Sequence, residues 1–435
     1  MNICKEEFVV DILEIKPTGR IRASVLVPGS KSYTNRALIT ALLAAGPSVI
    51  KNPLLSDDTR FMIAGLNTIG VSVKSVPEDN SLLVNGCSGK VPAREANIYA
   101  GNAGTVVRFM TAALTLGNGR YEIDGVERMR NRPIQELLDS LNQLGANVVS
   151  KDNTGCPPVV IHAHGLKGGT VRMKGDVSSQ YVSAILLAAP YATNDVRLVI
   201  TEDLVSKNYV DMTIDVMRKF GVTVRQDAYR EFFIESGQCY KGCGYIVEPD
   251  ASNASYFLAA AAITGGKVKI EGLGTNSLQG DAAFADILSR MGCTVKKSDD
   301  WMEIEGGELK GIDIDMNDTP DVVQTLAVVA VFAKGKTHIR NVKNLRYKET
   351  DRIKALVTEL QKIGVNVIEY DDGLEIEPAA PHAARIATYD DHRMAMSFAL
   401  IGLRSEGITL ENPDCVAKTF PDYFEKLQSI CNETP

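Results

Sequence analysis

The sequence predicts an α/β fold of two domains, each built from repeated βαβαββ-type units. Two helical patterns recur: an Ala- and Leu-rich run after a polar start, and an amphipathic run that ends in glycine before a β-branched run. The glycines recur at intervals of about 71 to 76 residues, and a fixed period indicates a repeated supersecondary unit. The 435 residues are also too many for one ordinary domain.

The first pattern predicts six helices in the interior. These runs are apolar on nearly every side, so they are expected to be buried. They occupy 35–46, 105–117, 180–190, 253–265, 322–335 and 392–402.

The second pattern predicts helices with a polar face, which should lie outside the first set. Each ends at a glycine that suits a left-handed C-cap. These glycines are Gly70, Gly145, Gly221, Gly292 and Gly364. Strands such as 71–76 and 82–84 follow, and the sixth copy is cut short at 424–430. The six units divide into two groups of three, with a hinge predicted near 242–249, where glycines and Pro249 gather.

Composition narrows the class of function. The net charge of −7 argues against bulk nucleic-acid binding. No stretch reaches the roughly 18 apolar residues of a membrane span, and the N-terminal segment lacks the pattern of a signal peptide. Eight scattered cysteines fit free thiols in a reducing cytoplasm. Neither Cys239 with Cys243 nor His162 with His164 completes a metal site, so no metal is expected.

The segment 28–38 predicts an anion site. It places Lys31, Ser32 and Arg36 at the start of an apolar helical run. A helix N-terminus offers unpaired N–H groups and a partial positive charge, so it favours anions. A phosphate or a carboxylate is the expected ligand.

Other conspicuous polar residues also precede helices. They are 57–60, 102–105, 128–132, 178–180, 206–209, Asp250, Asp321, 348–352, 391–393 and 418–419. If all units share one topology, these residues lie on facing edges of the two domains and line a cleft. The cations are too many for one phosphate, which predicts two anionic substrates or one with several charges. These cations are Lys31, Arg108, Arg132, Lys348, Arg352, Arg393 and Lys418.

Two carboxylates, Asp321 and Glu349, stand among these cations. A carboxylate in a cationic cleft can take or relay a proton. Equally, both can be salt-bridge partners, and Arg108 can hold the fold or touch a ligand. Phosphate-loop and dinucleotide motifs are incomplete at 29–32 and 272–277, and no nucleophile elbow occurs.

Eight segments, taken in order over the whole length, resemble the EPSP synthases, which are enolpyruvyl transferases. The segments are PGSKS with NRAL (28–38), GNAGT with Arg108 (101–108), RNRPI (130–134), VSSQ (177–180), DASNASY (250–256), KETDR (348–352), DHRMAM (391–396) and KTFP (418–421). The resemblance implies two pseudo-threefold domains, each an inside-out α/β barrel, spanning 29–248 and 1–28 plus 249–435. The site is then the cleft between them.

The resemblance also implies a reaction. Phosphoenolpyruvate and shikimate 3-phosphate give 5-enolpyruvylshikimate 3-phosphate and phosphate, with no metal or organic cofactor. The two substrates carry two phosphates and two carboxylates, which agrees with the number of cations. The expected partners are these small molecules only, without nucleic acid or membrane, and the chain is expected to be a cytoplasmic monomer.

Matching positions imply the role of each site residue. The shikimate 3-phosphate ligands are Lys31, Ser32, Arg36, Ser178, Ser179, Gln180, Ser206, Asp321, Asn344 and Lys348. The phosphoenolpyruvate ligands are Lys31, Asn102, Gly104, Arg132, Gln180, Arg352, Arg393 and Lys418. Asp321 is the expected base at the 5-hydroxyl, with Lys31 as the open alternative, and Glu349 is the expected acid at the enol methylene.

One departure and three alternatives stay open. The resemblance implies that glyphosate competes with phosphoenolpyruvate. Phe109 follows Arg108 where many relatives have proline, and this difference leaves the degree of sensitivity open. The sister family that uses UDP-N-acetylglucosamine usually has a loop cysteine near the donor, whereas Cys87 and Cys156 lie outside the matched segments. The remaining classes are a silent anion-binding protein and a phosphotransferase, the latter without a complete phosphate loop.

Overall fold

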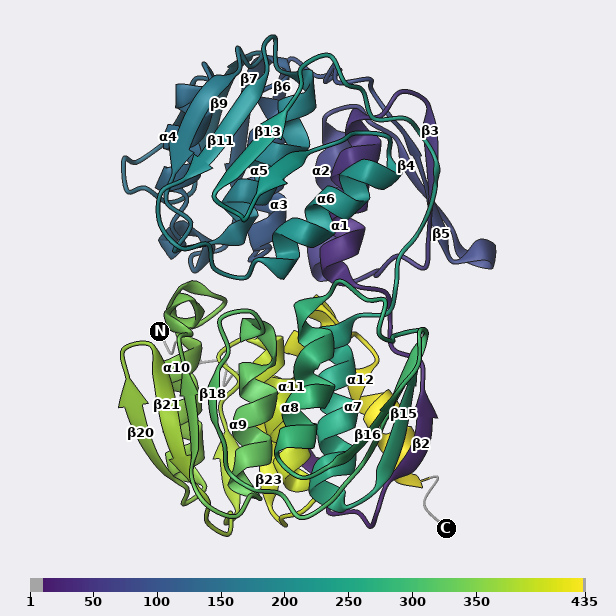
Figure 1. Cartoon of the computed structure of the whole chain (residues 1–435), viewed down its shortest axis with the longest axis vertical. Helices are drawn as coiled ribbons and strands as arrows, with labels where there is room; N and C mark the ends of the chain where they lie inside the picture. Colours follow the sequence, from purple (N-terminus) through teal and green to yellow (C-terminus); the bar gives the residue numbers. More distant parts are fainter. Residues whose placement is uncertain (1–10, 433–435) are drawn as a thin grey trace, which may run out of the picture.

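The computed structural model describes residues 11–432 and confirms the α/β fold of two domains. Within these residues the strands form six sheets. The buried apolar side chains form one core within 33–247 and another within 15–27 and 251–430. Figure 1 shows the two bodies stacked along the long axis of the molecule. We call them the N-half and the C-half.

The N-half contains three units. The first has α1 (Lys31–Leu43), α2 (Asp57–Thr68) and the sheet β14 (Gly244–Ile246), β3 (Pro47–Lys51), β5 (Ser81–Asn85), β4 (Val73–Val76). The second has α3 (Gly104–Leu114), α4 (Gln135–Gln143) and the sheet β6 (Glu95–Tyr99), β7 (Asn118–Asp124), β9 (Val159–His164), β8 (Val148–Ser150). The third has α5 (Ser179–Ala188), α6 (Asn208–Lys219) and the sheet β10 (Gly169–Met173), β11 (Val196–Ile200), β13 (Glu231–Ile234), β12 (Arg225–Asp227).

The C-half repeats the plan. The fourth unit has α7 (Ala251–Thr264), α8 (Phe284–Arg290) and the sheet β2 (Arg22–Val25), β15 (Lys267–Glu271), β17 (Trp301–Glu305), β16 (Thr294–Lys297). The fifth has α9 (Val323–Val331), α10 (Arg352–Lys362) and the sheet β18 (Asp313–Asp315), β19 (Thr337–Arg340), β21 (Gly373–Glu377), β20 (Asn366–Tyr370). The sixth has α11 (His392–Gly402), α12 (Tyr423–Asn432) and the sheet β1 (Ile12–Ile15), β23 (Ile408–Glu411), β22 (Ala384–Ile386).

All units share one strand pairing. In every sheet one outer strand pairs parallel with its neighbour, as β10 does with β11 and β22 with β23. The remaining strands of the four-stranded sheets add in antiparallel order, as β13 and β12 do. This repetition confirms the predicted unit and places the start of every first-type helix at the same edge of its half.

The Ala- and Leu-rich helices lie inside the ring of sheets. Every residue of α3, α7 and α11 is buried, because these helices present apolar or small side chains in all directions. In the C-half, α7, α9 and α11 contact one another. The amphipathic helices, such as α4 and α10, keep an exposed face, as the sequence predicts.

The predicted glycine caps are confirmed. Each of the five has a positive φ: Gly70 +89°, Gly145 +88°, Gly221 +88°, Gly292 +112° and Gly364 +88°. A side chain is strained in this left-handed region, so glycine ends each amphipathic helix without cost.

The chain crosses between the halves twice, at adjacent places. The Ser30 amide donates to the Glu248 carbonyl (2.8 Å), and the Asp250 amide donates to the Pro28 carbonyl (2.9 Å). A Cβ atom at Gly29 would lie 2.0 Å from the Asn52 carbonyl oxygen, so only glycine fits at this crossing. Both crossings therefore run side by side as a paired two-strand connection.

The sixth unit is the truncated copy that the sequence predicts: within the described residues its sheet has three strands, whereas the other sheets have four. Strand β1, from the other end of the chain, pairs antiparallel with β23. It occupies the position that the third strand has in other units. The period of a repeat cannot reveal this exchange, because β1 lies almost 400 residues upstream of its partner.

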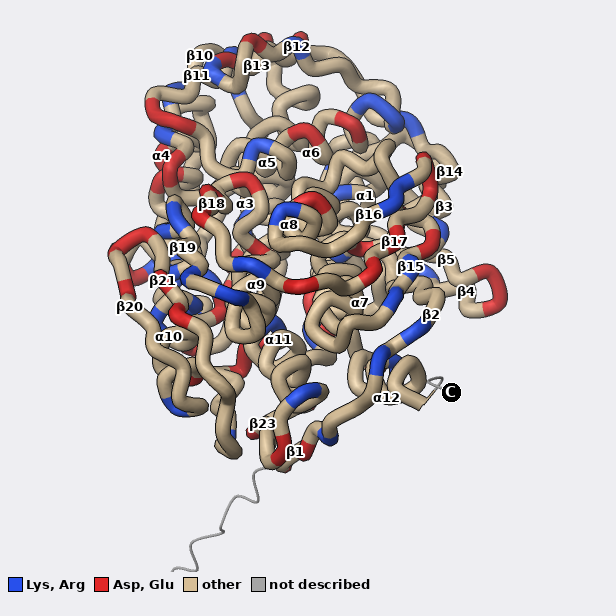
Figure 2. The backbone as a smooth tube through the Cα atoms, turned by 60° about the horizontal axis from the view of Figure 1, so that its bottom comes forward, with Lys and Arg blue, Asp and Glu red and all other residues tan. Residues whose placement is uncertain are grey.

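The described residues contain no helix long and apolar enough to cross a membrane. Figure 2 shows acidic and basic positions interspersed over both halves instead of gathered into one large basic face. Residues 1–10, which the resemblance places in the second domain, lie outside the described part of the chain.

Candidate active site

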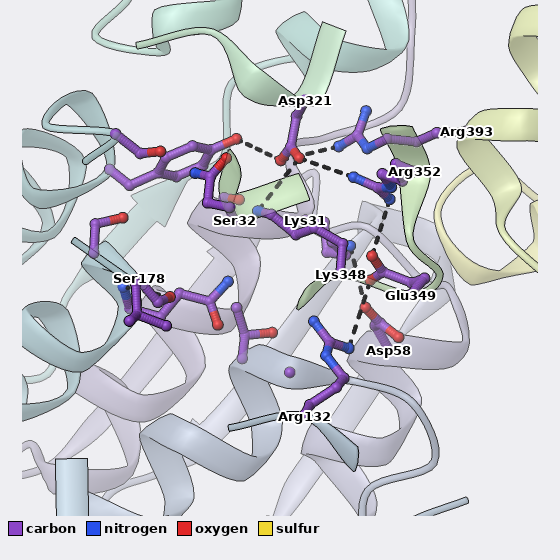
Figure 3. Close-up of a pocket in the computed structure, with 18 of the residues that line it drawn as sticks. Lys31, Ser32, Asp58, Arg132, Ser178, Asp321, Lys348, Glu349, Arg352 and Arg393 are labelled. Atoms are coloured by element: carbon purple, nitrogen blue, oxygen red, sulfur yellow. Dashed lines mark hydrogen bonds and ion pairs between the residues drawn. The ribbon is translucent and has the colours of Figure 1, made fainter. Parts of the chain in front are cut away.

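A pocket lies between the two halves, where helix starts from both face each other (Figure 3). From the N-half come Lys31, Ser32, Asp58, Gly104, Thr105, Arg132, Val177, Ser178, Ser179, Gln180, Ser206 and Tyr209. From the C-half come Asp321, Asn344, Lys348, Glu349, Arg352, His392 and Arg393. Backbone N–H groups and cations thus converge on one space, which suits anions.

Arg352, in the first turn of α10, organises the C-half side. Its Nε donates to Asp391 Oδ2 (2.7 Å) and its Nη2 to Glu349 Oε2 (2.9 Å). Its Nη1 donates to Asp321 Oδ1 (3.2 Å). Only 1% of this side chain is exposed, so the charge is held by three carboxylates in place of water. Burial alone would lower the pKa of Arg352, but Asp391 and Glu349 outweigh it and raise that pKa.

Asp321 lies at the meeting point of the two halves. It accepts a hydrogen bond from the Tyr209 hydroxyl (Oδ2, 2.8 Å) across the pocket. Arg393 Nη2 lies 3.3 Å from Oδ2, and Lys348 Nζ lies 3.6 Å from Oδ1. Burial opposes ionisation of this carboxyl, yet Arg393, Lys348 and Arg352 hold its pKa well below the usual range.

Glu349 faces the opposite side of the same pocket. Arg132 Nη1 lies 3.8 Å and Lys418 Nζ 4.0 Å from its Oε1. Burial again opposes ionisation, but Arg352, Arg132 and Lys418 hold the pKa of Glu349 well below its ordinary value. The carboxylate is therefore ionised in this arrangement.

Asp58 links the cations of the two halves. Its Oδ2 lies 3.1 Å from Lys31 Nζ of the N-half, and its Oδ1 lies 2.9 Å from Lys418 Nζ of the C-half. Lys418 also donates to the Asn102 carbonyl (2.9 Å), as Arg132 does (2.9 Å). This cluster forms the wall beside Gly104.

The start of α5 forms the other end of the pocket. Ser178 caps this helix, its hydroxyl accepting from the Gln180 amide (3.3 Å), and Ser179 is its first residue. Ser206 and Asn344 lie nearby, and Asn344 Oδ1 is buried without a hydrogen-bond partner among the described residues. Hydroxyls, amides and Lys348 in one place suit a phosphate group.

The structure brings most of the predicted site residues together. Those that line the pocket are Lys31, Ser32, Gly104, Arg132, Ser178, Ser179, Gln180, Ser206, Asp321, Asn344, Lys348, Glu349, Arg352 and Arg393. Asn102 and Lys418 line the neighbouring pocket on the far side of Asp58. Arg36 lines neither of these two pockets.

Arg36 is directed into the N-half. Its Nε donates to Thr213 Oγ1 (2.7 Å) and its Nη2 to the Tyr209 carbonyl (2.9 Å). Its guanidinium lies 5.3 Å from the centre of the Phe109 ring. Phe109 is buried against Arg36 and does not line the pocket, although Gly104 and Thr105 at the start of the same helix do. Arg108 donates a hydrogen bond to Gln180 Oε1 (2.8 Å). This contact orients the side chain of Gln180, which is one of the predicted substrate-binding residues.

Five lining residues had no predicted role: Asp58, Thr105, Val177, Tyr209 and His392. Their segments stood out as polar helix starts, but nothing in the sequence separates a residue facing the pocket from its neighbour. His392 is buried, and neither ring nitrogen has a hydrogen-bond partner among the described residues. Burial, Lys31 and Arg393 lower the pKa of His392 well below its usual value, so the ring is neutral.

Metal-ligating side chains do not cluster at this site. Within residues 11–432, no group of three or more His, Cys, Asp or Glu side chains is placed to hold a metal ion. The carboxylates of the pocket are instead paired with arginine and lysine.

Comparison with known proteins agrees with this geometry. A family model described as EPSP synthase (3-phosphoshikimate 1-carboxyvinyltransferase) matches residues 15–427. The chain belongs to the EPSP synthase family. A 3-phosphoshikimate 1-carboxyvinyltransferase of a Sulfurovum species is 48% identical over 422 residues, which cover 96% of this chain and 99% of that protein. One of Shewanella sediminis is 47% identical over 421 residues, with the same coverage.

A solved structure shares the fold of this EPSP synthase family member. EPSP synthase from Acinetobacter baumannii has a TM-score of 0.81 and 27% sequence identity, covering 96% of this chain and 98% of that one. The predicted family and the inside-out two-domain α/β fold are thus confirmed.

Proposed function

We propose that the pocket between the halves binds both substrates of the family's reaction and carries it out. The chain transfers the enolpyruvyl group of phosphoenolpyruvate to the 5-hydroxyl of shikimate 3-phosphate and releases phosphate, in the shikimate pathway that supplies aromatic amino acids. The observation that supports this site best is the convergence of helix starts and cations from both halves on one pocket. The domains correspond to 29–248 and to 1–28 plus 249–435.

The two ends of the pocket take different substrates. The phosphate of shikimate 3-phosphate binds at the start of α5, with Ser178, Ser179, Ser206 and Lys348 as donors. Its ring lies against Asp321 and Asn344, whose free Oδ1 is available to a hydroxyl. Ser32 and Gln180 complete this end. Arg36 contributes from beneath, through the segment 206–209 that its contact with Tyr209 orders.

Phosphoenolpyruvate binds beside Gly104. Arg132, Arg352, Arg393 and Lys31 offset the charges of its phosphate and carboxylate, and Lys418 and Asn102 close the wall behind Asp58. Binding requires these cations to exchange part of their contact with Asp58, Glu349 and Asp321 for contact with the substrate. Cations already fixed by carboxylates need little reorganisation when charge develops in the reaction.

The reaction is an addition followed by an elimination. Asp321 takes the proton of the 5-hydroxyl, with Lys31 as the neighbouring alternative, and the oxygen attacks the enol carbon. Glu349 gives a proton to the methylene carbon, which becomes a methyl group. The tetrahedral ketal then returns a methyl proton to the Glu349 carboxylate and expels phosphate, which restores the enolpyruvyl group on its new oxygen. Closure of the halves excludes water and so protects the ketal.

Glu349 must carry a proton for this step, whereas the surrounding cations lower its pKa. The substrates resolve this conflict. Their phosphates and carboxylates offset the positive charges of Arg352, Arg132 and Lys418. The pKa of Glu349 therefore rises when both substrates are bound. Proton uptake is thus tied to formation of the ternary complex.

Phosphate release tests this function. The enzyme is incubated with both substrates and EDTA, and each substrate is omitted in turn. Release that requires both substrates and resists EDTA supports the proposal. Binding of both substrates without release would favour the silent anion-binding protein, and failure to bind shikimate 3-phosphate would reopen the identity of the acceptor.

A cytoplasmic monomer remains the predicted state, and light scattering during size-exclusion chromatography checks the oligomeric state.

A further inference from the structure

Arg128 connects the halves at the segment that carries Lys348 and Glu349. It precedes the 3₁₀ helix η2 (Met129–Asn131) of the N-half and is half-buried. Its Nη2 donates to the Lys348 carbonyl (2.9 Å) and to the Arg346 carbonyl (3.3 Å), and its Nε donates to the Lys348 carbonyl (3.2 Å). All three hydrogen bonds cross from one half to the other.

The principal acceptor belongs to the peptide bond between Lys348 and Glu349. Lys348 has an extended backbone (φ −85°, ψ −155°), and successive side chains of an extended segment point to opposite sides. Lys348 accordingly points toward Asp321, and Glu349 toward Arg132. One peptide therefore aims a group at each substrate, and Arg128 holds that peptide from the opposite half.

A guanidinium can hold a carbonyl in a fixed orientation because its donors form a rigid planar fork. The cost of placing this cation here is evident from its surroundings: burial and the neighbouring Arg132 lower the pKa of Arg128. Its hydrogen bonds go to main-chain oxygens, so what they fix is the path of the backbone.

We propose that Arg128 is a positioning residue that fixes the Lys348–Glu349 peptide when the halves meet and thereby sets the Glu349 carboxyl at the enol methylene. This inference rests on the proposed function of the pocket. Arg128 lies outside the residues that line the pocket and acts through the backbone. Arg128 thereby makes protonation of the enol methylene depend on closure of the two halves, because Glu349 is aligned only in the closed enzyme.

Arg130, which lies two residues further along in η2, supplies a matched control. It is exposed and pairs within the N-half with Asp124, its Nε lying 3.0 Å from Oδ1 and its Nη2 2.5 Å from Oδ2. Replacement of Arg130 removes the same charge from η2 without removing a contact between the halves.

The test compares Arg128→Ala, Arg128→Lys and Arg130→Ala with the unmodified enzyme. Single-turnover formation of the ketal, kcat, the KM for phosphoenolpyruvate and the Kd for shikimate 3-phosphate are measured, with the melting temperature as a check on folding. Arg128→Ala is expected to slow ketal formation and kcat by about 10- to 100-fold. The Kd for shikimate 3-phosphate should change by less than about threefold, because the serines of the N-half still bind its phosphate.

Arg128→Lys should recover part of the rate, since an ammonium can donate to the same carbonyl, and Arg130→Ala should match the unmodified enzyme. An unchanged kcat in Arg128→Ala, or an equal loss in Arg130→Ala, would overturn the positioning role. A loss that appears wholly in the Kd for shikimate 3-phosphate would do so too. If the unmodified enzyme released no phosphate, the failure would lie with the proposed function instead.

Discussion

The Tyr209 hydroxyl and the Asp321 carboxylate lie on opposite halves of the molecule and are joined by a 2.8 Å hydrogen bond. Tyr209 lies in the first turn of α6, whereas Asp321 lies in the 3₁₀ helix η5 (Pro320–Val322). The proposed base is thus oriented by a residue of the other half. This contact also helps to hold the pKa of Asp321 low.

Tyr209→Phe removes this contact and separates the two candidate bases. If Asp321 takes the proton, loss of the donor raises its pKa, so the acid limb of the kcat profile should move to higher pH. The rate at the optimum should fall about 3- to 10-fold. The measurement is the kcat profile, extended from pH 9 to the lowest pH at which both proteins stay folded, because the acid limb of a carboxylate with a lowered pKa lies in the acidic range. An acid limb at the same pH would shift the role of base to Lys31.

Glu349→Gln tests the acid. The amide retains the size of the side chain and removes the proton that goes to the methylene carbon, so kcat should fall at least about 100-fold. The Kd for shikimate 3-phosphate should change little, because Ser178 and Ser179 lie at the other end of the pocket. Calorimetric titration and the phosphate-release rate check both points. Near-normal turnover would remove Glu349 from the chemistry.

Gly104→Ala tests the room beside the enolpyruvyl donor. A Cβ atom at Gly104 would lie 2.4 Å from Arg108 Nη1 and 2.8 Å from Arg132 Nη2, so both guanidinium groups must move. Because Arg132 is proposed to bind phosphoenolpyruvate, the KM for phosphoenolpyruvate should rise about tenfold or more. Glyphosate should compete with phosphoenolpyruvate in the unmodified enzyme and bind less tightly in the variant. Inhibition without competition would place glyphosate elsewhere.

Burial of the Asp281 carboxyl is expected to make the free energy of unfolding depend on pH. Burial raises its pKa to about 7, and its Oδ1 has no hydrogen-bond partner among the described residues. The unfolded chain loses this proton near pH 4, while the folded chain keeps it until about pH 7. The folded state therefore binds more protons in this window, so the free energy of unfolding falls as pH rises from about 4 to 7 and is level above.

Asp281→Asn removes that dependence. Relative to the unmodified enzyme, the variant should gain stability progressively between about pH 4 and 7 and keep a gain of about 1 to 3 kcal/mol at pH 8. Ser252, whose hydroxyl donates to Asp281 Oδ2, can donate to the asparagine oxygen in the same way. Melting temperatures of both proteins across this range measure the difference. A constant difference at all pH values would show that Asp281 is ionised throughout.

Sequence patterns predicted the fold well where they are local. The period of the glycines and the apolar helices determine the repeated unit, because each reflects the packing of one helix or one turn. The exchange of β1 into the sixth unit lay beyond this reasoning, since it depends on pairing between the two ends of the chain. Strand β14 is a second long-range case: it follows the third unit in the chain, yet Gly244 pairs with Val49 of β3 in the first unit.

Site prediction had a similar limit. Residues at helix starts, such as Ser178 and Arg352, could be named because the unit brings all starts to one edge. Asp58 and Tyr209 act through partners in the other half, and only the meeting of the halves reveals those contacts. Arg36 shows the converse, because its position in a motif does not reveal that its guanidinium turns inward.

Reaction in D₂O tests whether this enzyme transfers the enolpyruvyl group by addition and elimination. Addition followed by elimination makes a methyl group that gains one deuteron and then loses one of three hydrogens, so deuterium must enter the methylene of the product. Mass spectrometry should therefore show that the product is 5-enolpyruvylshikimate 3-phosphate with deuterium in its enolpyruvyl methylene. The amount of this product should equal the amount of released phosphate. Release of phosphate with pyruvate in place of this product, or a product free of deuterium, would contradict enolpyruvyl transfer by addition and elimination in this pocket.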